Sequence, residues 1–159
     1  EAMEATYVLN PEECVTGPPH HKVVARNVSN ELVIAAYNRQ DESCIIGRFS
    51  EPSNSTGFDR MLGSIQLEGN ASWLEVTVSG MADALDDQRD YPIAALRDIG
   101  VPLKQLTRLY LRSEQKANIL VDTSTGRMLI NLINPKAGEA YDPPEPDDPR
   151  WVGVMRKRR

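Results

Sequence analysis

Residues 106–133 constrain the fold most, because they contain three apolar runs of strand length in quick succession. The runs are residues 106–112, 117–121 and 127–133. The last two are separated by residues 122–126, Asp-Thr-Ser-Thr-Gly, whose side chains bend the backbone locally and whose glycine suits a left-handed conformation. We therefore predict three successive strands, with the last two joined as a β-hairpin.

Further strands are predicted upstream. Apolar runs at residues 22–28 and 31–37 flank the polar pair Ser29 and Asn30, which suits a second hairpin. The run at residues 32–36 is apolar on both faces, so it fits either a central strand or a buried helical turn. A short strand is expected at residues 44–49.

A third hairpin is predicted from two runs at residues 64–68 and 73–79. In the second run, Leu74, Val76 and Val78 share one face, which is the period of two expected of a half-buried strand. Residues 51–57, Glu-Pro-Ser-Asn-Ser-Thr-Gly, read as a surface loop.

One short helix is predicted at residues 91–99. Asp90 can act as its N-cap, Pro92 fits the first turn, and Gly100 followed by Pro102 ends it. The predicted fold class is therefore α+β and strand-dominated. We expect antiparallel sheets packed as a sandwich or rolled sheet, with this helix and an extended C-terminal tail.

The chain divides by composition into three parts. Residues 1–19 are predicted to be an extended N-terminal arm, and residues 20–135 a globular β-rich domain. Residues 136–159 form an acidic, proline-rich tail with a basic C-terminus. The tail is too polar and too rich in proline to pack a core of its own.

Charge and hydropathy exclude some functions. With 159 residues the chain fits one domain, and its net charge of -5 argues against general nucleic-acid binding, which depends on phosphate neutralisation by Lys and Arg. A local contact by the basic C-terminus remains compatible with that charge. No apolar run approaches the roughly 20 residues of a membrane-spanning helix.

The two cysteines and the glycosylation sequons indicate in which cellular compartment the protein could reside. Cys14 and Cys44 are either a disulfide joining the arm to the strand at residues 44–49, or two inert thiols. Three Asn-X-Ser/Thr sequons fit a secreted glycoprotein, which we favour over a processed organellar or intracellular protein. The glycosylation candidates are Asn27, Asn54 and Asn70.

The only two histidines, His20 and His21, are adjacent. On an extended backbone neighbouring side chains diverge, whereas a metal site needs three or four converging ligands. No ligand spacing is present, so we predict neither a metal site nor a cofactor. The same histidines could act as acid or base, although no nucleophile is marked beside them.

The tail carries the functional prediction. Trp151 is expected to dock on its own domain or on a partner, because an aromatic side chain seldom stays exposed without a contact. The basic end is read as an acidic-partner contact, a multibasic processing site or a solvated terminus; its residues are Arg156, Lys157, Arg158 and Arg159.

We therefore predict a non-catalytic binding or structural module, either a secreted domain or an accessory subunit of a larger assembly. Its proline-rich tail would contact a protein partner. The alternative is a small secreted hydrolase or toxin-like enzyme that uses His20 or His21 as acid or base.

Overall fold

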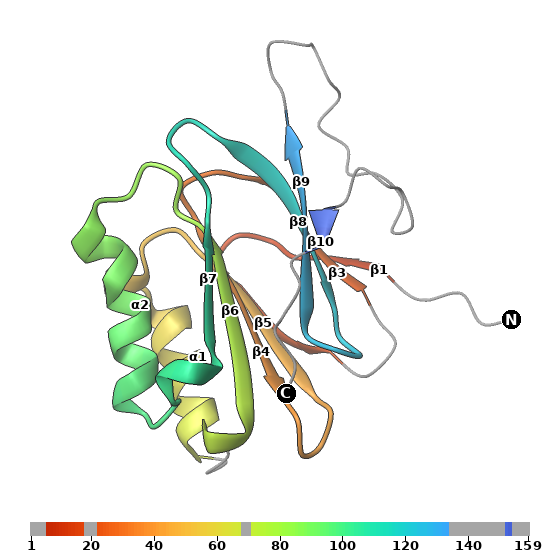
Figure 1. The fold of residues 1–159 in the computed structure, drawn as a ribbon, viewed down its shortest axis with the longest axis vertical. Helices are drawn as coiled ribbons and strands as arrows, with labels where there is room; N and C mark the ends of the chain where they lie inside the picture. Colours follow the sequence, from red (N-terminus) through yellow and green to blue (C-terminus); the bar gives the residue numbers. More distant parts are fainter. Residues whose placement is uncertain (1–5, 18–21, 68–70, 134–151, 154–159) are drawn as a thin grey trace, which may run out of the picture.

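The fold is a two-sheet sandwich with helices on one outer face, as a computed structural model shows (Figure 1). The structure describes residues 6–17, 22–67, 71–133 and 152–153. Figure 1 shows α1 and α2 on one side of β4–β7, and β3, β8 and β9 on the other. The strand-dominated α+β class predicted from the sequence is confirmed.

Each sheet has five strands. Sheet A has the order β1-β3-β8-β9-β10, and its strands are Thr6–Val8, Lys22–Val28, Lys116–Asp122, Arg127–Ile133 and Val152–Gly153. Sheet B has the order β2-β5-β4-β6-β7, and its strands are Glu13–Gly17, Cys44–Phe49, Leu32–Asn38, Leu74–Gly80 and Leu106–Tyr110.

Two α-helices cover sheet B. They are α1, Thr56–Leu67, and α2, Asp86–Asp98, and three 3-10 turns accompany them: η1, Pro52–Asn54; η2, Ala71–Trp73; and η3, Leu103–Gln105. Among the described residues, no helix combines the length and the apolar character needed to cross a lipid bilayer.

The sheets are mixed, which corrects the prediction of purely antiparallel sheets. Strand β1 pairs in parallel with β3, and β6 pairs in parallel with β7. Parallel neighbours need a crossover connection, and α2 lies in the connection between β6 and β7. The helix at residues 91–99 was predicted, but its role as a crossover was not, and this is why the direction of β7 relative to β6 was predicted wrongly.

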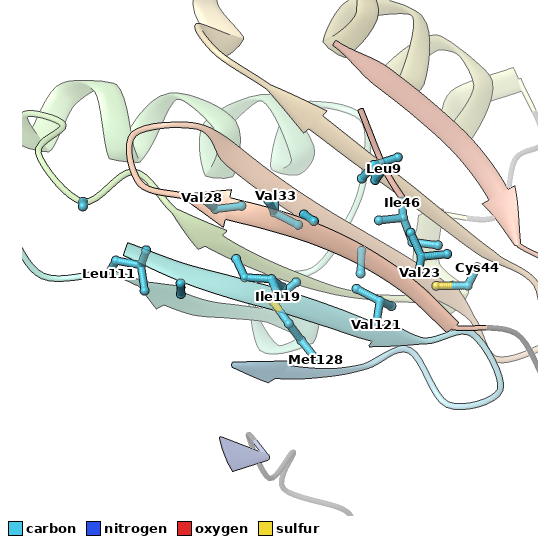
Figure 2. Close-up of a cluster of buried hydrophobic side chains, with 14 residues drawn as sticks. Leu9, Val23, Val28, Val33, Cys44, Ile46, Leu111, Ile119, Val121 and Met128 are labelled. Atoms are coloured by element: carbon cyan, nitrogen blue, oxygen red, sulfur yellow. The ribbon is translucent and has the colours of Figure 1, made fainter. Parts of the chain in front are cut away.

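The main core lies between the two sheets (Figure 2). Alternate residues of β4 face it, because successive side chains of a strand point to opposite faces. Val33 and Ala35 meet Ile119 and Val121 of β8 in this core, and Met128 of β9 completes it. All five residues are at most 1% exposed, so the interior is packed closely.

A second core lies between sheet B and the helices. The other residues of β4, Leu32, Ile34 and Ala36, pack there with Phe58 of α1 and Leu96 of α2. Strand β4 is therefore buried on both faces. This confirms the central-strand reading of residues 32–36 over the helical one.

The hairpin predicted at residues 117–133 is confirmed. Strands β8 and β9 pair from Lys116 opposite Ile133 to Asp122 opposite Arg127. The Gly126 N–H donates to the Asp122 carbonyl at 2.8 Å, and Gly126 has a φ of +70°. Glycine adopts that conformation without steric cost, as the sequence predicted.

Two predicted hairpins are wrong. Strand β3 belongs to sheet A and β4 to sheet B, so residues 22–28 and 31–37 do not pair with each other. Residues 64–67 do not form a strand, because residues 56–67 form α1, which begins within the predicted surface loop.

The predicted single helix also needs correction. Helix α2 begins at Asp86, so Asp90 and Pro92 lie inside it rather than at its N-terminus. The Gln88 side chain accepts a hydrogen bond from the Leu85 N–H at 2.9 Å and so closes the N-terminal turn. A proline within a helix removes one backbone hydrogen bond, which is why the sequence placed the boundary too late.

The predicted N-terminal arm contributes to both sheets. Strand β1 lies at one edge of sheet A, and β2 lies at one edge of sheet B. Of the predicted tail, the structure describes only β10, in which Val152 pairs opposite Ile130 of β9. The remainder of residues 136–159 lies outside the described residues.

Candidate functional site

A surface hollow of about 350 Å³ lies between β2, the neighbouring strand β5 and helix α1. We call it the β2–α1 groove. Its lining combines one carboxylate, one guanidinium, one thiol and two hydroxyls with apolar groups; the lining residues are Glu12, Cys14, Thr16, Ile45, Gly57, Arg60, Met61 and Ser64.

Strand alternation and helix periodicity place these residues. Cys14 pairs opposite Gly47, and Thr16 pairs opposite Ile45, which packs against the helix-side core. Cys14 and Thr16 therefore face α1, because directly paired residues share a face of the sheet. On α1, Gly57, Arg60, Met61 and Ser64 follow the spacing of one helical face.

Two glycines leave space for the buried ring of Phe49 between sheet B and α1. A Cβ atom on Gly47 would lie 2.5 Å from Cε2 of Phe49, and one on Gly57 would lie 2.9 Å from its Cε1. Phe49 in turn packs against Phe58, with ring centroids 5.6 Å apart. The missing side chains therefore allow α1 to sit close to sheet B beside the groove.

Glu12 occupies a strained turn at one end of the groove. The Glu13 N–H donates to the Asn10 carbonyl at 3.2 Å, so Pro11 and Glu12 are the central residues of a β-turn. Glu12 has a φ of +61°, at a position where glycine or asparagine is usual. A non-glycine residue holds this conformation only when its surroundings fix it.

The carboxylate of Glu12 supplies that fixation. It accepts hydrogen bonds from the Ser50 N–H at 2.6 Å and from the Ser55 hydroxyl at 3.2 Å. The Ser50 N–H is the main cause that lowers the pKa of Glu12, against a smaller opposing effect of burial. The Ser55 hydroxyl also accepts a bond from the Phe58 N–H at 3.1 Å, so it caps α1.

Cys14 is accessible but chemically quiet. Partial burial of the thiol, and then the nearby Glu13 carboxylate, raise the pKa of Cys14 to about 11. The thiol is therefore protonated at neutral pH, whereas the thiolate is the nucleophilic form.

Arg60 is the cation of the groove. Its side chain is exposed on α1, and it makes no ion pair or hydrogen bond with any residue that the structure describes. A guanidinium offers five donors in a planar fork that matches a carboxylate.

The outer edge of β2 borders the groove. Strand β2 pairs antiparallel with β5 from Glu13 opposite Arg48 to Gly17 opposite Cys44. No other strand of the described chain pairs with β2. On an edge strand, backbone N–H and C=O groups of alternate residues point outward without a partner.

A second polar cluster joins the two sheets. Arg48 donates from Nη2 to Oε1 of Glu31 at 2.5 Å and to the carbonyl of Arg26 at 2.9 Å, and from Nη1 to the carbonyl of Leu9 at 3.2 Å. We call Leu9, Arg26, Glu31 and Arg48 the Arg48 junction. The Arg48 side chain is only 9% exposed and each of its three nitrogens donates within the protein, so it has a structural role.

A β-bulge makes the junction possible. The pairing of β3 with β8 shifts between Ala25 and Val28, and Asn27 has a φ of +54°. The Asn27 N–H donates to Oδ1 of Asn118 at 2.9 Å. Arg26 therefore lies outside the regular ladder, and its carbonyl accepts from Arg48.

The predicted disulfide is wrong. Cys44 faces the core between the sheets, as Figure 2 shows, whereas Cys14 faces the β2–α1 groove. They are also three positions apart along the β2–β5 ladder, about 10 Å, beyond the Cα separation that a disulfide spans. Neither cysteine takes part in a disulfide among the described residues.

The other predicted site residues are not brought together. Asn27 and Asn54 are exposed on different elements, and Asn70 lies outside the described residues. Glycosylation stays a prediction. His20 and His21 also lie outside the described residues. So do the predicted contact residues of the tail, which are Trp151, Arg156, Lys157, Arg158 and Arg159. No group of three metal-ligating side chains occurs in the described parts.

Sequence reasoning missed Glu12 and Arg60. The signal for α1 was present, because Phe58, Met61 and Ile65 follow helical spacing after the capping Ser55. A helix at residues 56–67 would have placed Arg60 on its surface. Its approach to β2, more than forty residues earlier in the sequence, has no local signal.

Comparison with known proteins supports the fold alone. No protein-family model matches the sequence, and no curated protein matches it significantly. Among solved structures, the chain is similar to the Bacillus licheniformis hypothetical protein YfiH, with 10% identity and a TM-score of 0.50. The alignment covers 62% of this chain and 51% of that one, so the match spans about half of that protein.

Proposed function

We propose that this protein is a non-catalytic binding module, and that the β2–α1 groove holds part of a partner protein. One observation carries the proposal: a hollow whose cation has no acceptor among the described residues lies directly beside β2, an edge strand of the described sheet. Such an edge can pair with another chain, and a guanidinium can fix the register of that chain.

The chemistry of the groove favours binding over catalysis. The Cys14 thiol is protonated at neutral pH, since its pKa is raised to about 11. The Glu12 carboxylate is occupied by Ser50 and Ser55, and its lowered pKa keeps it ionised, so it is a poor general acid.

We propose the C-terminal tail as a second contact. Its proline-rich composition favours an extended chain, which can reach a partner at little cost in ordering. The support is compositional: Trp151 offers a large contact area and residues 156–159 offer positive charge.

Affinity capture followed by reconstitution tests the proposal. A protein captured by the full chain is purified, and its Kd is measured with the wild type, with Arg60→Glu and with Trp151→Ala. We expect Arg60→Glu to weaken binding at least tenfold, because it replaces the only cation in the described lining of the groove with an anion. The proposal fails if no captured protein binds after purification, or if neither variant changes the Kd.

The hydrolase alternative depends on His20 and His21, which lie outside the described residues. The double variant His20→Ala/His21→Ala separates the two functions. Under the binding proposal it keeps the wild-type Kd, and neither protein hydrolyses a panel of ester, peptide and phosphodiester substrates. Turnover by the wild type that the double variant loses would replace the binding proposal with the hydrolase.

A further inference from the structure

We infer that the β2–α1 groove binds an extended peptide segment of a partner protein. The segment adds to β2 as a sixth strand of sheet B, and one of its acidic side chains pairs with Arg60. The inference rests on the proposed function and specifies the chemistry of the partner.

The backbone of β2 provides the first half of the recognition. Its five residues, Glu13–Gly17, present one continuous edge of about 17 Å, which matches a peptide of five residues. Main-chain hydrogen bonds of this kind give affinity without demanding a particular sequence. The edge therefore selects the conformation of the peptide.

The groove provides the second half. On an added strand, every second side chain points to the same face as Cys14 and Thr16, towards α1. There it meets apolar surface from Ile45 and Met61 and the hydroxyls of Thr16 and Ser64. The volume of about 350 Å³ is at the lower end of the range for ligand pockets, so it suits one or two side chains.

The guanidinium of Arg60 selects an acidic side chain. Arg60 has no acceptor among the described residues, whereas the neighbouring Glu12 already accepts two hydrogen bonds. The groove therefore holds one anion and one cation, and of the two it is the cation, Arg60, that keeps all its donors available with respect to the described residues. A bidentate carboxylate contact gives geometric specificity as well as attraction.

A second copy of the chain fits the groove less well. Two β2 strands could pair edge to edge, but the groove-facing residues of β2 are Cys14 and Thr16, and Glu13 lies on the other face. A second copy would therefore bring no carboxylate from this strand to Arg60. Its net charge of -5 would also repel an identical molecule.

A displayed library tests the inference with a defined probe. The full-length protein is used to select random octapeptides displayed on phage, and the enriched peptides are synthesised. We expect Asp or Glu to dominate one position, with apolar residues two positions away. We expect Arg60→Ala to weaken the binding of a synthetic peptide at least tenfold. Arg97→Ala, an exposed arginine of α2, is the matched control and should change binding less than twofold.

Backbone recognition has its own readout. Only alternate N–H groups of a strand face its neighbour. N-methylation of the peptide at every second residue should therefore abolish binding for one of the two possible sets of positions and leave it nearly unchanged for the other set. Amide hydrogen exchange should slow at two or three alternate residues of β2 when the peptide binds.

The results separate the inference from the proposed function. Enriched peptides that ignore both Arg60 and N-methylation overturn the inference, as does a selection without enrichment. Dimerisation through β2 that excludes the peptide also overturns it, in favour of a second copy. If a purified partner protein still binds the chain in any of these cases, the proposed function stands and only its assignment to an extended acidic peptide fails.

Discussion

Arg48 and Arg60 lie on opposite sides of sheet B and have opposite surroundings. Arg48 is almost buried and donates to Glu31 and to two backbone carbonyls, whereas Arg60 is exposed and contacts no described acceptor. A buried cation that donates from all three guanidinium nitrogens to fixed protein acceptors holds its neighbours in position. An exposed cation beside a hollow has donors left for another molecule.

Strand alternation produces the difference. Arg48 points from β5 towards sheet A, and the preceding residue, Gly47, lies on the opposite face, beside the groove. One short strand therefore supports a structural junction on one face and a candidate binding surface on the other. Changes at Arg48 should affect folding, and changes at Arg60 should affect binding.

Arg48→Met should have the largest effect. It removes the charge partner of Glu31 and leaves the carbonyls of Leu9 and Arg26 without their donor. Breaking a buried pair from one side costs about 3–5 kcal/mol, and we expect urea denaturation to show a loss in that range. The double variant Arg48→Met/Glu31→Met should recover part of it. A loss below about 1 kcal/mol would show that the junction is not structural.

Gly80→Ala should be the next most damaging change. Gly80 has a φ of +86°, and an added Cβ would lie 1.9 Å from the carbonyl oxygen of Glu31. That oxygen accepts the Met81 N–H at 3.0 Å, so the strain would reach the Arg48 junction. We expect a loss of about 2–4 kcal/mol in the free energy of unfolding.

Gly63→Ala is the control for this substitution. Gly63 lies within α1, and an added Cβ meets no atom within 4 Å. Alanine should therefore stabilise the protein by about 0.5–1 kcal/mol through helix propensity. Equal effects of the two substitutions would contradict the close approach of Gly80 to Glu31.

Glu12→Gln should have a smaller, pH-dependent effect. The pKa of Glu12 is lowered on folding, mainly by the Ser50 N–H, so the ionised carboxylate stabilises the folded protein above the unfolded value near 4.5. We expect the wild type to be more stable than the variant by about 1 kcal/mol at pH 7. The difference should disappear as the pH falls through the lowered pKa, and urea denaturation at pH 7 and pH 3 measures it. A difference in stability that grows on acidification would contradict the lowered pKa of Glu12 in the folded protein.

Arg60→Ala should have the smallest effect on stability. Its side chain contacts no described acceptor, so we expect a change within about 0.5 kcal/mol, which is normal for a surface position. The melting temperatures of Arg60→Ala and Arg97→Ala should be nearly equal. A large loss for Arg60→Ala alone would mean that Arg60 is structural and that the contrast with Arg48 is wrong.

Local patterns in the sequence predicted local structure well. The alternation of Leu74, Val76 and Val78 gave the buried face of β6, and the turn ending at Gly126 gave the β8–β9 hairpin. Both depend on residues close together in the chain, whose preferences act without help from the rest of the fold.

The assignment of consecutive strands to different sheets could not be predicted in this way. Ser29 and Asn30 look like a hairpin turn, but the Ser29 and Glu31 carbonyls accept the N–H groups of Ala82 and Met81. The chain therefore passes from sheet A to sheet B through contacts with residues fifty positions later. The same limit applies to the groove, which requires β2 and α1 to meet.

Helix α1 was missed for a different reason. Gly57, Gly63 and the preceding proline and serine residues are poor helix formers or favour turns. The buried side chains Phe58, Met61 and Ile65 hold the helix against sheet B instead. Tertiary packing thus outweighs the weak local preference.

The opposite orientations of Cys14 and Cys44 give the protein two internal reporters. Cys14 can be alkylated in the folded protein, because its thiol lies at the surface. The rate should rise about tenfold for each pH unit as the pH approaches 11 and the thiolate forms. Alkylation of Cys44 requires the sandwich to separate, because that thiol lies in the closed interior. A single labelling time course, read by mass spectrometry, would therefore record occupancy of the surface site and opening of the interior in the same molecule.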